Sequence, residues 1–224
     1  MMLTSDLQRP PLSRAVAWRE VGLAVVVLWL VLGGACFFLG AQSIYDRWGT
    51  SLNATLVLDV VFLIGCLAVI GFVFWRQRRQ GEGIVELGWG RPVRMPVIVI
   101  AVVYGLAWTA MSYMRGGDPL AFPWQRPIMM AIGLVLAFAE EIAVRGLILD
   151  RLARCGTSRI IQIVVTAGIM AVYHGVVGHS VWPSYMVSSF VLFGVLSVIY
   201  VYGGRSLTPV YIAHAMAHFL GDPA

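Results

Sequence analysis

The chain consists of apolar runs of about 20 residues separated by short polar segments. A helix of roughly 20 residues spans the hydrocarbon core of a bilayer, and lipid admits few other folds for such a run. Only 12% of the residues are charged, whereas a soluble domain of this size carries roughly 25%. We therefore expect an all-α, polytopic transmembrane helical bundle of about seven spans, or eight. The predicted spans cover residues 18–39, 52–75, 96–114, 128–149, 160–177, 185–202 and 207–220.

The basic residues divide unequally between the two ends of these spans. All 16 are arginines, so a catalytic lysine is excluded. Twelve arginines flank the spans on the side of the N-terminus and three lie on the opposite side. Cytoplasmic loops carry such an excess, which predicts a cytoplasmic N-terminus. The net charge of +5 lies beside the spans and therefore indicates no nucleic-acid partner. We expect an integral protein of the bacterial plasma membrane, with the lipid bilayer as its partner.

Three segments follow from this reading. Residues 1–17 are polar and are expected to form a disordered cytoplasmic tail, and residues 18–127 form the N-terminal transmembrane helices and loops. Residues 128–220 form a helical core that contains the polar residues discussed next. Polar turns are expected at Asp46-Arg47 and over residues 115–127, and Trp75 is typical of a membrane-interface anchor.

Three charged side chains interrupt the run 128–149: Glu140, Glu141 and Arg145. An ionised group at the centre of a bilayer costs at least about 2.5 kcal/mol, so such charges usually mark function. Glu141 and Arg145 are four residues apart and can form an ion pair within one helix. Glu140 is then the carboxylate without a built-in partner. The alternative is a structural ion-pair network that holds helices together.

All four histidines lie in the last 51 residues. His174 lies inside the span 160–177, and His214 and His218 share one face of the span 207–220 because they are four residues apart. His179 follows a glycine near the outer surface and is expected to be a loop residue. Helical rise brings Glu140, His214 and His218 to similar depths near the middle of the membrane. Interhelical hydrogen bonding, packing or haem ligation remain alternatives for these histidines.

Two hydrolytic chemistries fit this set. A carboxylate and an imidazole can activate a water molecule as general base, and further imidazoles can donate to a developing oxyanion. The same residues can instead bind a divalent metal such as zinc, which lowers the pKa of a bound water molecule. Both routes hydrolyse an amide or ester, and the residues leave the metal-free and metal-dependent routes equally open.

The order of these motifs resembles that of the CPBP intramembrane proteases, also called Abi proteins, which include the CAAX prenyl endopeptidases. That family carries EExxxR, then FxxxH, then HxxxN or HxxxD. Here the corresponding residues are Glu140-Glu141-xxx-Arg145, His174 and His214-xxx-His218, and the resemblance covers about residues 128–220. It implies that Glu140 and His174 activate water, that His214 and residue 218 stabilise the oxyanion, and that Glu141 and Arg145 support the site.

Two positions differ from the family pattern. Met170 replaces the phenylalanine of FxxxH, which affects packing. His218 replaces asparagine or aspartate; it can still donate a hydrogen bond, and it can also make a better metal ligand. Other membrane-protease motifs (HExxH, GxSG and GxGD) do not occur in the sequence.

We therefore expect an intramembrane endopeptidase that cleaves a membrane-associated peptide or protein, with a lipidated substrate as one option. The first alternative is a non-catalytic membrane protein of the same fold, such as a bacteriocin-immunity or partner factor. The second is a proton or metal transporter. It is disfavoured because the polar residues are confined to three spans and form no continuous path across the membrane.

Overall fold

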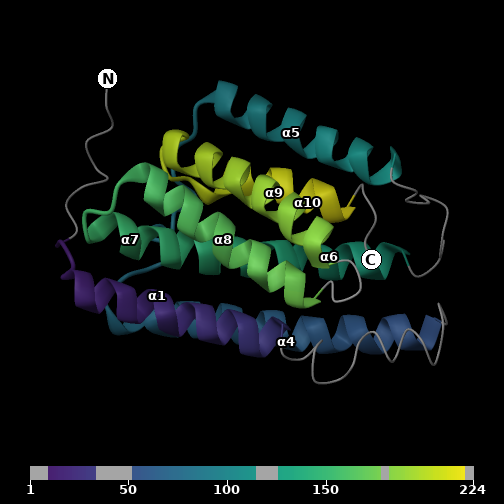
Figure 1. Cartoon of the computed structure of the whole chain (residues 1–224), viewed down its shortest axis with the longest axis horizontal. Helices are drawn as coiled ribbons and strands as arrows, with labels where there is room; N and C mark the ends of the chain where they lie inside the picture. The colour runs from purple at the N-terminus through teal and green to yellow at the C-terminus, as the bar shows by residue number, and fades with distance from the viewer. Residues whose placement is uncertain (1–9, 34–51, 115–125, 178–181, 220–224) are drawn as a thin grey trace.

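The computed structural model describes residues 10–33, 52–114, 126–177 and 182–219. These residues form seven helical rods and no strand (Figure 1). Two rods contain π-helical segments, η2 and η3, which continue α1 and α6 respectively without a break. The elements are α1 (Arg14–Leu28), η2 (Trp29–Gly33), α4 (Leu52–Arg79), α5 (Met95–Met114), α6 (Arg126–Glu141), η3 (Ile142–Leu149), α7 (Asp150–Arg154), α8 (Arg159–Val177), α9 (Trp182–Tyr202) and α10 (Leu207–Phe219).

The prediction of an all-helical chain is confirmed. By length and composition, residues 14–33 and 60–79 are long and apolar enough to cross a membrane. Residues 95–111, 159–175 and 186–202 form shorter apolar helices, so the number of spans stays a prediction. Several predicted features lie outside the described residues: the turn at Asp46-Arg47, the end of the first run at 34–39, the loop 115–125, His179, and residues 1–9 of the tail.

Two predicted boundaries are wrong. The turn expected over residues 115–127 ends earlier, because α6 begins at Arg126. The tail was expected to extend to residue 17, but α1 begins at Arg14. The reason is an N-cap: the side chain of Ser13 accepts a hydrogen bond from the backbone N–H of Val16 at 3.3 Å. Such a cap satisfies a donor that the first helical turn leaves unpaired. Polar residues in this segment therefore start a helix.

The rods run roughly side by side along the long axis of the molecule (Figure 1). The continuous rod α6–η3–α7, called the site helix below, contacts α1 and α4 on one side and α8 and α10 on others. Helix α8 packs along α9, and α10 packs against both α5 and α6. Small residues permit close approaches: a Cβ added to Gly105 of α5 would lie 3.0 Å from the carbonyl oxygen of Ala213 in α10.

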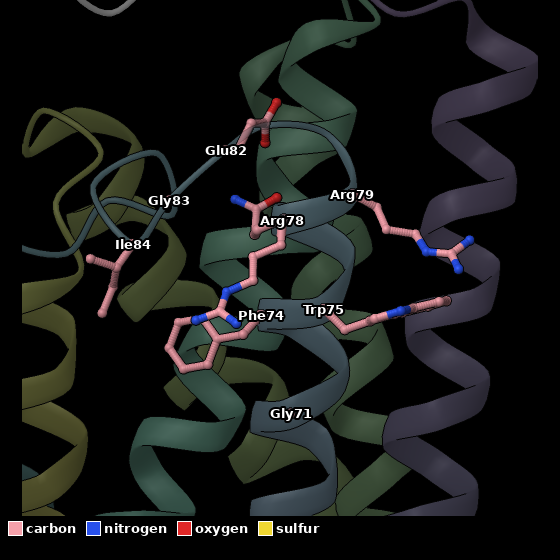
Figure 2. A pocket seen from close by; sticks show the side chains of 9 residues that line it. Gly71, Phe74, Trp75, Arg78, Arg79, Glu82, Gly83 and Ile84 are labelled. Carbon is pink, nitrogen blue, oxygen red and sulfur yellow. The ribbon is translucent and has the colours of Figure 1, made fainter.

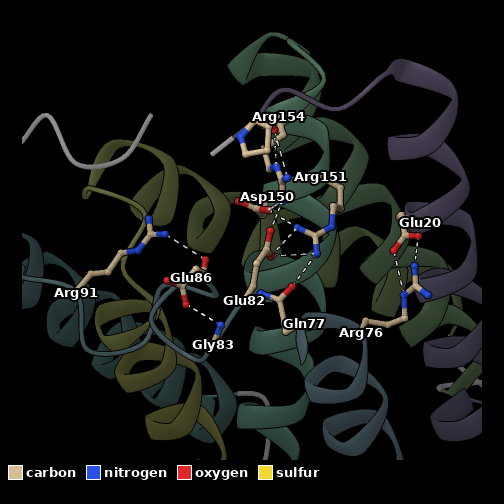
Figure 3. A network of polar contacts seen from close by, with 11 residues as sticks. Glu20, Arg76, Gln77, Glu82, Gly83, Glu86, Arg91, Asp150, Arg151 and Arg154 are labelled. Atoms are coloured by element: carbon tan, nitrogen blue, oxygen red, sulfur yellow. Dashed lines mark hydrogen bonds and ion pairs between the residues drawn. The ribbon is translucent and has the colours of Figure 1, made fainter. Parts of the chain in front are cut away.

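A layer of ion pairs fastens one end of this bundle (Figure 3). Glu82, in the turn after α4, bonds to Arg154 at 2.6 Å and to Arg151 at 3.4 Å. Arg151 is fully buried and also bonds to Asp150 at 2.6 Å and to Gln77 at 2.7 Å. Both terminal nitrogens of Arg151 have acceptors, which offsets much of the cost of burying its charge. These contacts fix the turn after α4 against the end of the site helix.

Candidate active site

The predicted charged cluster lies in the middle of the site helix, where α6 passes into η3. Glu140 and Glu141 are the last two residues of α6, and Arg145 lies inside the π-helical segment. Their side chains are buried, with 1%, 0% and 0% of their surface exposed. π-Helical segments within α-helices are uncommon and frequently occur at functional sites. Every residue of η3 is buried, so the cluster is enclosed by the surrounding helices.

Glu141 and Arg145 form the ion pair expected from their spacing. Arg145 donates from one terminal nitrogen to Glu141 Oε1 at 3.0 Å. Its other terminal nitrogen donates to the backbone carbonyl of Phe193 at 2.8 Å, and its guanidinium lies 5.0 Å from the centre of the Phe193 ring. The pair therefore connects the site helix to α9. Pairing of this kind lowers the large cost of burying each charge alone.

His214 of α10 contacts both glutamates. Its Nδ1 lies 2.9 Å from Glu141 Oε1, and its Nε2 lies 3.7 Å from Glu140 Oε2. An ionised carboxylate can only accept, so Nδ1 carries the proton that bonds to Glu141. In the neutral tautomer, Nε2 then presents its lone pair toward Glu140. Glu141 thus orients the imidazole, as a carboxylate does beside a catalytic histidine.

Glu140 has different polar partners from its neighbour. Atom Oε2 of each glutamate is buried and has no hydrogen-bond partner among the described residues, and Glu141 is held through Oε1 by Arg145 and His214. The side chain of Tyr173, in α8, forms a hydrogen bond with the Glu140 carboxylate. A buried polar atom without a partner in the protein is costly and indicates a position for water or a ligand.

His174 and His218 join the cluster through ring contacts. The His174 ring lies 4.9 Å from that of Phe193, and its Nδ1 donates to the backbone carbonyl of Met170 at 2.9 Å. The His218 ring lies 5.1 Å from that of His214. Phe193 also packs edge-on against His214 at 5.2 Å. Glu140, Glu141, Arg145 and His214 are therefore in direct polar contact, and the other two histidines surround them.

Two residues of this cluster are absent from the motif set. The first is Tyr173, whose contact with Glu140 is described above; its only signal in the sequence is that it precedes His174. The second is Phe193, which contacts Arg145, His174 and His214. Its carbonyl is a generic backbone group and its ring resembles any apolar residue of a span. Nothing in the sequence distinguishes it.

The donor atoms of the cluster do not form a metal site. Within residues 10–33, 52–114, 126–177 and 182–219, no group of three or more His, Cys, Asp or Glu side chains is arranged to hold a metal ion. Nδ1 of His214 is held by Glu141, and Nδ1 of His174 by a backbone carbonyl. Four- or five-coordinate zinc requires several such atoms to point at one position. The steps proposed below are therefore assigned to protein groups and water.

Residues 122–220 match the family model described as type II CAAX prenyl endopeptidase Rce1-like. The chain contains an Rce1-like domain. The resemblance expected from the three motifs is thereby confirmed. The Rce1-like segment includes the whole site helix and α8, α9 and α10, and hence all six predicted site residues. No curated protein and no solved structure matches the chain.

The family is membrane-embedded and its members are proteases that act on peptides or proteins. Helices α1, α4 and α5 lie outside the matched segment.

Proposed function

We propose that the chain is an intramembrane endopeptidase that hydrolyses a peptide bond of a membrane-associated substrate, with water as the nucleophile. The observation that carries the proposal is the juxtaposition of Glu140 Oε2, which lacks a protein partner among the described residues, with His214 Nε2 at 3.7 Å. A water molecule between a carboxylate and an imidazole can lose a proton to either group.

Glu140 is the general base in this reaction. It accepts a proton from the water as the water oxygen attacks the carbonyl carbon of the substrate. His174 assists, because its Nδ1 already donates to Met170 and the neutral ring therefore has its lone pair on Nε2. When the tetrahedral intermediate collapses, the carbon–nitrogen bond breaks and the amine nitrogen takes the proton from Glu140. The products are a carboxylic acid and an amine, which exchange a proton to give the carboxylate and the ammonium form.

His214 and His218 stabilise the negative oxygen of the intermediate. His214 donates to Glu141 through Nδ1, so it donates from Nε2 as well only in its imidazolium form. Glu141 stabilises that positive charge, and Arg145 holds Glu141 in place. Preorganised donors of this kind are worth about 10²–10³ in rate each.

The test is the loss of hydrolysis on replacement of the proposed base. Glu140→Gln keeps the shape of the side chain but cannot accept a proton, and we expect activity to fall by about 10²–10⁴. The assay uses purified full-length protein with internally quenched peptides, each made with and without a prenylated C-terminal cysteine. Glu86→Gln, in the turn after α4, is the matched control. Full activity in Glu140→Gln would refute the mechanism. Absence of hydrolysis by the wild type would instead support a non-catalytic membrane protein.

We also propose that the arginine-rich end of the bundle faces the cytoplasm. The turn after α4, the α7–α8 turn and the α9–α10 turn meet at this end: Arg151 bonds to Glu82, Arg205 bonds to Gln162, and Leu207 bonds to Gly88. Cys155 lies in the α7–α8 turn. In a variant that retains only this cysteine, a membrane-impermeant maleimide should label it only after the inner membrane is permeabilised. Labelling of Cys155 in intact spheroplasts would show that the arginine-rich end faces away from the cytoplasm and would overturn the proposed orientation.

A further inference from the structure

A groove of about 870 Å³ lies along α4 near the end of that helix, outside the Rce1-like segment (Figure 2). Four of its lining residues, Gly71, Phe74, Trp75 and Arg78, follow the spacing i, i+3, i+4 and i+7 and so share one face of α4. Gly71, Trp75 and Arg78 are exposed. The groove shares no residue with the candidate active site, so its role is separate from the proposed reaction.

Gly71 forms a notch in the outward surface of α4. A Cβ added at this position would meet no other heavy atom within 4 Å, so the space above the backbone is open. Figure 2 places Phe74 and Trp75 on either side of the helix just beyond the notch. Toward the start of α4, Val60, Ile64 and Leu67 are each more than half exposed. In a membrane-embedded chain, exposed apolar side chains on a long apolar helix face acyl chains.

Two arginines form the polar end of the groove. Arg78 and Arg79 are exposed, and neither forms a salt bridge with any described residue. The guanidinium of Arg79 lies 4.7 Å from the centre of the Trp75 ring, an arrangement that leaves its N–H donors available. Arginine donors suit phosphate oxygens, and the end of an apolar span lies at the depth of lipid headgroups.

The other charges near the groove are already paired. Arg76 forms an ion pair with Glu20 of α1. Glu82, the one acidic residue among the lining side chains, is bonded to Arg151 and Arg154 on its other side. The charge that the groove presents to an incoming molecule is therefore positive. An anionic ligand is favoured, and a zwitterionic one brings a cation that this surface does not complement.

We propose that this groove binds one anionic glycerophospholipid. The phosphate is held by Arg78 and Arg79, and an acyl chain lies in the notch over Gly71 and continues along Leu67, Ile64 and Val60. Charge complementarity selects the headgroup class, and the apolar track continues from the groove into the membrane. A soluble anion would satisfy the arginines but would leave the notch and the track without an apolar partner.

The test measures lipid retention by native mass spectrometry on the purified full-length protein. The probes are dioleoylphosphatidylglycerol and dioleoylphosphatidylcholine, which share acyl chains and differ in net charge. We expect the wild type to retain one phosphatidylglycerol in preference to phosphatidylcholine. Each interfacial arginine contributes to such binding, so Arg78→Gln/Arg79→Gln should weaken phosphatidylglycerol binding about tenfold or more. The matched control is Arg94→Gln/Arg159→Gln, which removes two exposed arginines outside the groove and should stay within about twofold.

A second pair of variants tests the notch independently of charge. Gly71→Leu fills the open space without a clash in the protein, and Gly22→Leu on α1 does the same at another exposed glycine. We expect only Gly71→Leu to weaken phosphatidylglycerol binding. Equal retention of the two lipids by the wild type, equal losses in the two arginine double variants, or unchanged binding in Gly71→Leu would each overturn the proposal.

Discussion

Arg145→Met tests whether the buried ion pair exists mainly to neutralise Glu141. Arg145 is fully buried and has two acceptors, Glu141 Oε1 at 3.0 Å and the Phe193 carbonyl at 2.8 Å. Removing one partner of a buried pair costs about 3–5 kcal/mol, and leaving a carbonyl without its donor costs about 1–3 kcal/mol. Because His214 still donates to Glu141 at 2.9 Å, we expect the loss of stability to lie near the lower end of the first range. We expect a loss of about 3–4 kcal/mol in the free energy of unfolding.

The double variant Glu141→Gln/Arg145→Met separates this explanation from simple loss of packing. It removes both charges together, while the new amide oxygen at position 141 still offers an acceptor to His214. We expect most of the stability to return, leaving a deficit of about 1 kcal/mol from the Phe193 carbonyl. The measurement is unfolding by SDS in mixed micelles. A single variant within about 1 kcal/mol of the wild type, or a double variant no more stable than the single, would refute the neutralisation argument.

Two further variants probe the walls of the site. A Cβ added at Gly133 would lie 2.8 Å from His218 Cβ. Gly133→Ala should therefore displace His218, lower activity and cost about 1–3 kcal/mol of stability. The control is Gly168→Ala, whose added Cβ meets nothing within 4 Å and should leave activity and stability unchanged. Tyr173→Phe should lower activity about tenfold through loss of the hydrogen bond to Glu140. The control is Tyr211→Phe, which removes a hydroxyl that donates to the Leu134 carbonyl and should leave activity unchanged. Equal rates in the two variants would contradict this prediction.

Much of the candidate site could be predicted because its spacing is local. Residues four apart on one helix meet, so spacing alone predicts the ion pair of Glu141 and Arg145. The helical rise per residue also predicts that Glu140 and His214 lie at similar depths in the membrane, and their polar atoms lie 3.7 Å apart. These inferences require only the helical rise and the apolar pattern. The all-helical fold follows from the same pattern.

The remaining contacts depend on tertiary packing that spacing does not encode. Phe193 supplies a carbonyl to Arg145 from 48 residues away, and His214 reaches Glu141 across 73 residues. The motifs indicate that His214 belongs to the site but not which glutamate holds its Nδ1. The apolar pattern and the 3.6-residue period also do not predict the π-helical segment η3.

In the proposed mechanism, the two adjacent glutamates perform two different tasks. A carboxylate that holds a histidine must keep an oxygen engaged, as Glu141 Oε1 is with His214 and Arg145. The proposed general base is Glu140, whose buried Oε2 has no hydrogen-bond partner among the described residues and lies 3.7 Å from His214 Nε2. Adjacent positions on a helix point about 100° apart, so the pair can face different partners from one turn. On this reasoning, exchanging the roles of Glu140 and Glu141 would require moving Arg145 as well.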